Sequence, residues 1–167
     1  GEIPASPSNS SAHEQWDGSS WTETTELNVA RRANVGFGAT SAAVLQASGY
    51  TTTAVAITEQ WDGSSWTEVG DLNTGAEYRA PSGNSSALVL ASGGYTTGSP
   101  GYTANVEFWN GTSWTEIANL GTARTNVSGT GSATTGMAIG GQSGPPTQIT
   151  TVEETTVGLA NKTITAS

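Results

Sequence analysis

The amino-acid sequence predicts an all-β chain built from a repeated four-stranded antiparallel unit. A ten-residue segment occurs three times at a spacing of about 45 to 48 residues, a length typical of such units. In each copy two tryptophans flank an Asp-Gly or Asn-Gly pair, and these pairs close tight β-hairpins because they adopt positive φ at little cost. No part of the sequence has the sustained periodicity of an amphipathic helix.

The repeated segment is predicted to form the two outer strands of each unit. It reads EQWDGSSWTE at residues 14–23 and 59–68, and EFWNGTSWTE at residues 107–116. A weaker fourth copy opens at Val152 without the tryptophans. Residues 22–27 continue the first hairpin and are predicted to be a strand. Residues 162–165 are predicted to be the last strand. This strand lacks the tryptophan hairpin, as terminal repeats are often atypical.

The two inner strands are predicted from the sequence between the hairpins. A leucine after each hairpin leads to an arginine, and a glycine-punctuated stretch and a short apolar run follow. The apolar runs, at residues 42–45, 87–91 and 137–139, have the length of buried strands. Glycines end the runs, where a sharp exit from a crowded centre favours a residue without Cβ: Gly49, Gly93, Gly94, Gly140 and Gly141.

The repeat frame divides the chain into one half unit and three units. The predicted ranges are 1–26 for the outer half of a preceding unit, then 27–72, 73–120 and 121–167. We expect earlier sequence, or another chain, to supply the absent inner half. A repeated four-stranded antiparallel unit of this length is typical of a β-propeller blade, so the sequence predicts about three and a half blades of one propeller domain.

The composition excludes several classes of function. Five basic and fourteen acidic residues give a net charge of −9, which disfavours binding to nucleic acid and to anionic membranes. No apolar run is long enough to insert into a bilayer. With no cysteine and one histidine, thiolate zinc sites and thiol catalysis are excluded, and we expect no metal or other cofactor.

The repeat resembles the kelch family of propellers. That family pairs Gly-Gly after an apolar strand with a Glu-x-Tyr-Asp hairpin, a Trp, a Leu, and an Arg that opens the next blade. The matching residues in the third copy are Gly93, Gly94, Glu107, Trp109, Trp114, Leu120 and Arg124. Trp replaces the family's usual aromatic residue before the Asp, and the turn is shorter. The chain looks closest to Trp- and Thr-rich tandem-repeat proteins of marine phages and bacteria, which implies a virion or surface protein.

The residues that recur in every copy are interpreted as structural. The tryptophans offer flat faces for sugar rings, but a residue present at one place in each copy more often packs between blades. One Glu and one Arg in each copy suit a half-buried ion pair or a hydrogen bond to a loop backbone, and copies spread around a ring cannot converge as an acid–base pair. A ring of exposed arginines on one face is the alternative. The residues assigned to this structural repeat are Trp16, Trp21, Trp61, Trp66, Trp109, Trp114, Glu14, Glu59 and Glu107.

Two enzyme types with propeller folds do not match the sequence. The Asp-Gly-Ser-Ser-Trp run is one residue shorter than the Asp-box of sialidases, and four arginines are few for a sialidase site. A copper oxidase of the galactose-oxidase type needs a cysteine cross-linked to tyrosine and several histidines, which this chain lacks. We therefore expect the protein not to be an enzyme.

The sequence predicts a non-enzymatic interaction module at a cell or virion surface, with protein subunits of the same assembly or a host-surface glycan as partners. The loops after the glycines vary most among the copies, so specificity is expected there. The candidate binding residues are Tyr50, Tyr95, Tyr102, Arg79 and Arg124. Two alternatives are a structural spacer, in which Tyr95 packs on its own blade, and a glycan-active enzyme. We also expect an oligomer or a longer chain.

Overall fold

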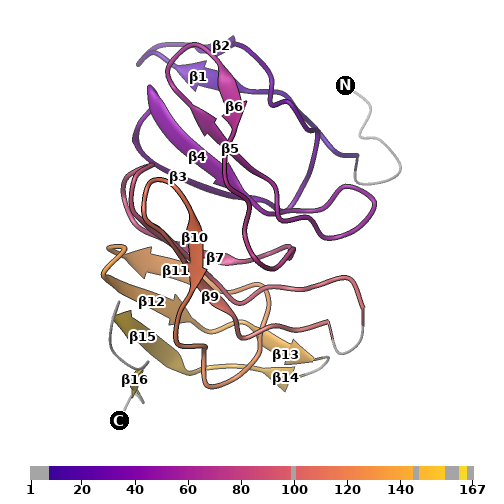
Figure 1. Cartoon of the computed structure of the whole chain (residues 1–167), viewed down its shortest axis with the longest axis vertical. Coiled ribbons are helices and arrows are strands. Elements are labelled where there is room, and N and C mark those ends of the chain that lie inside the picture. Colours follow the sequence, from indigo (N-terminus) through magenta and orange to yellow (C-terminus); the bar gives the residue numbers. More distant parts are fainter. Residues whose placement is uncertain (1–7, 99–100, 145–146, 157–161, 165–167) are drawn as a thin grey trace.

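The computed structural model describes residues 8–98, 101–144, 147–156 and 162–164. These residues form strands, turns and loops, and among them there is no helix that could cross a membrane. The strands form a two-stranded hairpin and three four-stranded antiparallel sheets in chain order, with a second small hairpin inside the last sheet's sequence (Figure 1).

Each four-stranded sheet is built from consecutive sequence. Sheet I contains β3 (Val35–Thr40), β4 (Ala43–Ala47), β5 (Thr58–Trp61) and β6 (Trp66–Glu68). Sheet II contains β7 (Ala80–Ser82), β8 (Val89–Ser92), β9 (Val106–Trp109) and β10 (Trp114–Glu116). Sheet III contains β11 (Ser128–Gly131), β12 (Thr135–Ile139), β15 (Val152–Thr156) and β16 (Lys162–Ile164).

Two hairpins complete the described structure. The N-terminal hairpin pairs β1 (Glu14–Trp16) with β2 (Trp21–Glu23), and a small hairpin pairs β13 (Gln142–Gly144) with β14 (Thr147–Gln148). In sheets I and II the strand order follows the chain, so the predicted order from the glycine-rich strand to the Trp-Thr-Glu strand is confirmed. The repeated tryptophans face each other across their hairpins, as Trp61 does with Trp66.

The sheets follow one another along the longest axis of the molecule, from the N-terminal hairpin to sheet III (Figure 1). In the described part of the chain they close into neither a barrel nor a ring. The core lies between neighbouring sheets. Val35, Phe37, Leu45, Val89, Trp109 and Trp114 fill the space between sheets I and II. Ala80, Leu90, Val106, Leu120, Val127 and Ala138 fill the space between sheets II and III.

Some elements differ from the sequence prediction. The predicted strand at residues 22–27 ends at Glu23, because the following chain turns to hydrogen-bond the lead-in segment: the Thr24 N–H donates to the His13 carbonyl, and the Leu27 N–H donates to the Ser11 carbonyl. The variable loop that follows Gly140 and Gly141 contains the β13–β14 hairpin, where the sequence predicted no strand. The predicted last strand is present as β16, and Thr165 lies outside the described residues.

Glycines allow the sharp exit after the second strand of each sheet. Gly93 and Gly94 have φ of 63° and 121°, and Gly140 and Gly141 have φ of 64° and 103°. A Cβ at Gly94 would lie 2.9 Å from the Glu77 carbonyl oxygen, so this position needs glycine for space as well as for conformation.

The hairpin turn after β5 is held by the Asp62 side chain. Its Oδ1 accepts the backbone N–H of Ser64 at 2.8 Å and of Ser65 at 2.9 Å. The bonds from Ser65 and Ser64 to the ionised carboxylate lower the pKa of Asp62 from its ordinary 3.8 to about 2. Asn110 makes the same two bonds, at 2.9 Å each, in the next copy without a charge.

We predict that Asp62→Asn flattens the dependence of stability on acid pH. Because the folded-state pKa lies below the unfolded-state value, the stabilisation from ionised Asp62 is complete above about pH 4 and is lost as the pH falls towards about 2. The asparagine keeps the turn but does not titrate. Urea-unfolding midpoints at several pH values in this window measure the effect. An unchanged acid slope in the variant would show that the turn does not contribute.

Candidate interaction surface

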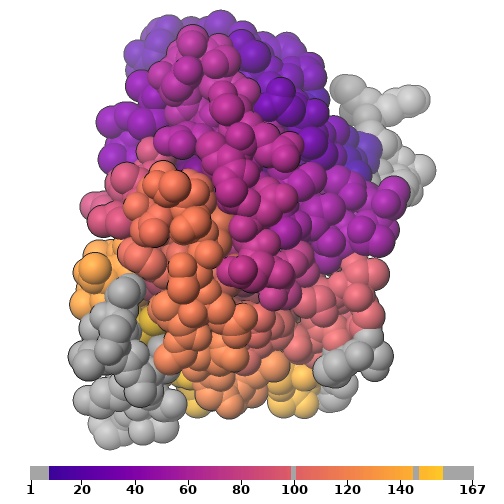
Figure 2. All heavy atoms as spheres, in the orientation of Figure 1, coloured from indigo at the N-terminus to yellow at the C-terminus, as the bar shows by residue number. Residues whose placement is uncertain are grey.

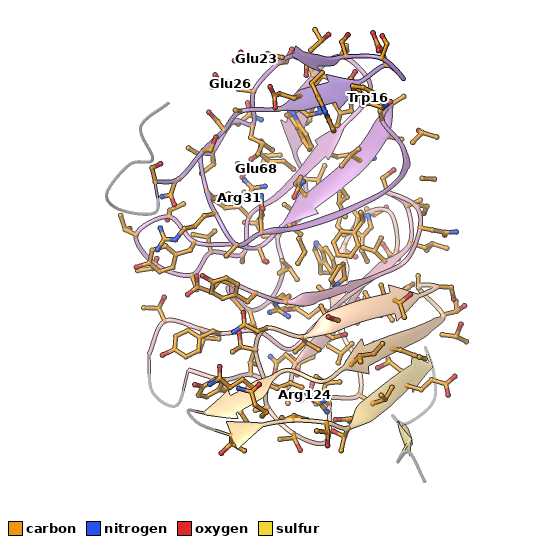
Figure 3. All side chains as sticks on the ribbon, turned by 180° about the vertical axis from the view of Figure 1, so that it is seen from behind. Trp16, Glu23, Glu26, Arg31, Glu68 and Arg124 are labelled. Atoms are coloured by element: carbon orange, nitrogen blue, oxygen red, sulfur yellow. The ribbon has the colours of Figure 1, made fainter. Side chains whose placement is uncertain are left out.

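The repeated Arg and Glu residues form buried ion pairs. Arg31 pairs with Glu59, Arg79 pairs with Glu107 at 3.2 Å, and Arg124 pairs with Glu153. These side chains are almost completely inaccessible to solvent, and Figure 3 shows Arg31 and Arg124 inside the layered sheets. The prediction of one structural ion pair per copy is confirmed for Glu59 and Glu107. It fails for Glu14, which is exposed on the N-terminal hairpin.

Each paired glutamate also fixes the chain that enters its sheet. Glu107 accepts the backbone N–H of Asn73 at 2.6 Å and of Thr74 at 3.2 Å, and it accepts the Asn73 side-chain amide at 2.9 Å. Glu59 has the corresponding bond from the Asn28 N–H, and Glu153 has it from the Gly121 N–H. The carboxylate therefore ties the third strand of a sheet to the loop that precedes its first strand.

The arginines reach these glutamates from two different backbone positions. Arg31 and Arg124 lie four residues after the loop leucine, whereas Arg79 lies seven residues after Leu72. The loops themselves have equal length, because the residue with positive φ falls six residues after the leucine in all three: Ala33, Tyr78 and Asn126. Ala76 is buried where sheet I has Arg31. The same ion pair thus forms although the arginine has moved along the loop.

Burial dominates the electrostatics of Arg79 and Arg124. It lowers the pKa of Arg79, and the nearby Glu107 carboxylate opposes that shift. Burial also lowers the pKa of Arg124. Because both guanidinium groups lie in the interior, they cannot serve as the exposed polar partners that the sequence predicted. The alternative of an exposed arginine ring is wrong for the same reason.

Tyr50 and Arg32 lie next to each other in two loops of sheet I. Tyr50 follows the exit from β4, and its backbone pairs with that of Arg32 through two hydrogen bonds. The Arg32 guanidinium lies over the Tyr50 ring, 4.1 Å from its centroid, which is a cation–π contact. The Arg32 Nη1 also donates to the Asn9 side chain at 3.1 Å. Tyr50 is half-buried.

The corresponding loop of sheet II contains Tyr95 and Tyr102. Their rings pack edge to face with centroids 5.3 Å apart, and the Tyr95 ring lies against Gly101 so closely that a Cβ there would be 2.5 Å from it. The Tyr95 backbone pairs with Glu77 as Tyr50 pairs with Arg32. Burial raises the pKa of Glu77, and Arg32 opposes this shift. Both tyrosines are half-buried.

Tyr78 is a further aromatic residue that the sequence analysis did not select. It is 44% exposed, and its backbone N–H donates to the Ala33 carbonyl of the neighbouring sheet's loop at 3.1 Å. When the copies are aligned on their arginines, Tyr78 falls immediately before Arg79. It is therefore not matched with Ala33 and Asn126, which occupy the same turn in the other copies. The positive φ of 56° at Tyr78 identifies the turn position only once the structure is known.

Backbone bridges join Arg32 to Tyr50, Glu77 to Tyr95, and Tyr95 to Tyr102. We call the surface formed by these residues and Tyr78 the loop-end surface. Its residues are Arg32, Tyr50, Glu77, Tyr78, Tyr95 and Tyr102. The exit loops of sheets I and II touch, because the Ala54 N–H donates to the Thr97 hydroxyl at 2.6 Å. Both loops and the β13–β14 hairpin lie on the right side of Figure 1, and Figure 2 shows the two loops adjoining there. The turns of the tryptophan hairpins lie on the other side.

The loop-end surface is open. No pocket is present in the part of the chain that the structure describes. Within the same residues, no three His, Asp or Glu side chains are grouped closely enough to hold a metal ion. An accessible surface of aromatic rings with one cation and one carboxylate suits stacking and hydrogen bonding to an extended ligand.

Comparison with known proteins identifies the fold and no family. No family model matches the chain, and no curated protein matches it. Its structure is similar to that of YjhT, with a TM-score of 0.70 and 11% sequence identity. The match covers 87% of this chain and 49% of YjhT, so the chain spans about half the length of that protein. An identity this low shows that the two chains share a fold and shows nothing more.

Proposed function

We propose that the chain is a set of kelch-like β-propeller blades that acts as a non-enzymatic interaction module, and that it binds an extended partner through the loop-end surface. The proposed setting is outside a cell or on a virion, and the proposed partner is a surface glycan or a protein of the same assembly. The observation that carries this proposal is the presence of Tyr50, Tyr78, Tyr95 and Tyr102 in adjoining loops of two sheets.

The distribution of chemical groups supports binding over catalysis. The recurrent carboxylates Glu59 and Glu107 are buried and neutralised by arginines, so they are not available to a substrate. The loop-end surface carries phenol rings, the Arg32 guanidinium and the Glu77 carboxylate; Tyr78 is exposed and the other residues are half-buried. Tyrosines contribute large contact areas at a small cost in side-chain entropy, and they are enriched among residues that dominate binding energy.

The test is attachment of the purified chain to an array of surface glycans and to extracts of candidate partner particles. Replacement of both Tyr95 and Tyr102 by serine is expected to weaken attachment about tenfold or more, because each lost ring contact removes on the order of 1 kcal/mol. Tyr78→Ser should also weaken it, and this exposed residue can be changed with little effect on folding. Glu68→Ser, on the outer strand β6 and outside the surface, is the matched control. Unchanged attachment in both tyrosine variants would place the binding site elsewhere.

A structural spacer is the second candidate, and the packing of Tyr95 favours it. This ring lies against Gly101 and Tyr102, as expected if the loop only connects strands. Attachment to the glycan array and to the particle extracts separates the interaction module from the spacer, because a spacer binds its neighbours in the assembly and no glycan. Under the spacer function the tyrosine replacements change stability and leave every attachment unaltered.

A further inference from the structure

The two tryptophans of the N-terminal hairpin lack the cover that their repeats have. The exposed fractions are 48% for Trp16 and 65% for Trp21, against 2% for Trp61, 7% for Trp66, 1% for Trp109 and 6% for Trp114. The hairpins are otherwise alike: the paired rings lie 5.5 to 5.6 Å apart in all three. The difference in burial therefore comes from what surrounds each hairpin.

In sheets I and II, the inner strand pair covers the first tryptophan. Val44 of β4 is the cross-strand partner of Trp61, and the Trp61 Nε1–H donates to the Ser41 carbonyl in the β3–β4 turn at 3.1 Å. In sheet II, Val89 of β8 and the Ser86 carbonyl have the same relation to Trp109, with a hydrogen bond of 3.2 Å. Among the described strands, β1 pairs with β2 alone, so its other edge is open.

Glu14 lacks the same partner. It occupies the repeat position of Glu59 and Glu107, which bind an arginine and a backbone N–H from the lead-in loop of an inner strand pair. On the hairpin this carboxylate is exposed. The open strand edge, the Trp16 indole and the Glu14 carboxylate thus all lack the groups that an inner strand pair supplies elsewhere in the chain.

We propose that the β1–β2 hairpin is a docking site for a free inner strand pair of the same repeat type on another polypeptide segment. The incoming second strand adds antiparallel to β1, its preceding turn offers a carbonyl to the Trp16 Nε1–H, and its lead-in arginine pairs with Glu14. This is strand addition at an open edge, with an ion pair and an aromatic contact that give specificity.

The inner pairs of a second copy of this chain are not the occupant. Its β4, β8 and β12 already pair with β5, β9 and β15, so no described inner pair is free. The proposal does not depend on the loop-end surface and stands if no partner binds there.

The test uses the 167-residue chain and a synthetic peptide of residues 27–49, which carries Arg31, β3 and β4. Because the other four tryptophans are buried, Trp16 and Trp21 dominate the solvent-exposed fluorescence. Binding is expected to shift the emission to shorter wavelength in a saturable manner and to reduce quenching by acrylamide. An Arg31→Gln peptide, and separately a Glu14→Gln chain with the original peptide, should bind about tenfold more weakly or worse, because each leaves one member of the ion pair without its partner.

Several outcomes would overturn the proposal. Absence of a saturable shift would show that the hairpin does not accept the strand pair. Equal binding by the Arg31→Gln peptide or by the Glu14→Gln chain would show that the contact is not this repeat pairing. Concentration-dependent protection of Trp16 and Trp21 in the chain alone, with a dimer in sedimentation, would assign the surface to a second copy. A Trp16→Phe chain confirms the location if it loses most of the shift.

Discussion

Replacement of Glu107 by glutamine is expected to lower the free energy of unfolding by about 3–5 kcal/mol, the cost of leaving a buried charge without its partner. The change is nearly isosteric, so the loss comes from electrostatics and hydrogen bonding. Arg79 would keep its charge in the interior, and the hydrogen bonds from Asn73 and Thr74 would weaken. The loss is a large part of the roughly 5–15 kcal/mol that stabilises a typical domain.

Glu14→Gln is the matched control for this prediction. It changes the same repeat position, but Glu14 is exposed, so the expected effect is within about 0.5 kcal/mol. Urea unfolding followed by circular dichroism measures both variants. Similar small losses at Glu107 and Glu14 would show that the buried pair does not contribute to stability.

The displaced arginine provides a rescue experiment. Arg79→Asn removes the cation and is expected to destabilise the chain by a similar amount, because Glu107 is then buried without its partner. Adding Ala76→Arg moves the arginine to the position that it has in sheet I, and the double variant should recover most of the loss. A double variant less stable than Arg79→Asn alone would show that the loop of sheet II cannot adopt the arrangement around Arg31.

The sequence predicted the strand order because its signals are local. The Asp-Gly and Asn-Gly turns fix the hairpins, and the glycine exits fix where the second strands end. Each hairpin signal is weak when taken alone, but its repetition in three copies makes the prediction of a repeated four-stranded unit strong. The β13–β14 hairpin was missed because its prolines and glycines are equally typical of a loop.

The loop-end surface was predicted less well because it depends on contacts between sheets. Tyr50, Tyr95 and Tyr102 were found as aromatic residues in variable loops, and the structure places them at one end. The sequence allowed Arg79 and Arg124 either as ion-pair partners or as exposed polar partners, and their burial leaves only the first interpretation. Tyr78 was missed because the arginine of sheet II had moved by three residues, which shifted the alignment of that loop.

Trp109→Ala is expected to lower the free energy of unfolding by about 3–5 kcal/mol. Trp109 is fully buried in the core between sheets I and II, and its indole N–H donates to the Ser86 carbonyl. Alanine would leave a cavity against Val89 and remove the hydrogen bond. Trp61→Ala should cost a similar amount, since its ring is buried and its indole donates to the Ser41 carbonyl.

Trp16→Ala should cost less than about 1 kcal/mol, although Trp16 stands in the same sequence motif. Figure 3 shows Trp16 at the end of the molecule formed by the N-terminal hairpin, where its main ring contact is with Trp21. Thermal unfolding of the Trp109→Ala, Trp61→Ala and Trp16→Ala variants measures the three losses of stability. It compares the same hairpin tryptophan with an inner strand pair beside it, as at Trp61 and Trp109, and without one, as at Trp16. Equal losses at Trp16 and Trp109 would mean that the hairpin itself, and not its neighbours, determines the contribution of the tryptophan.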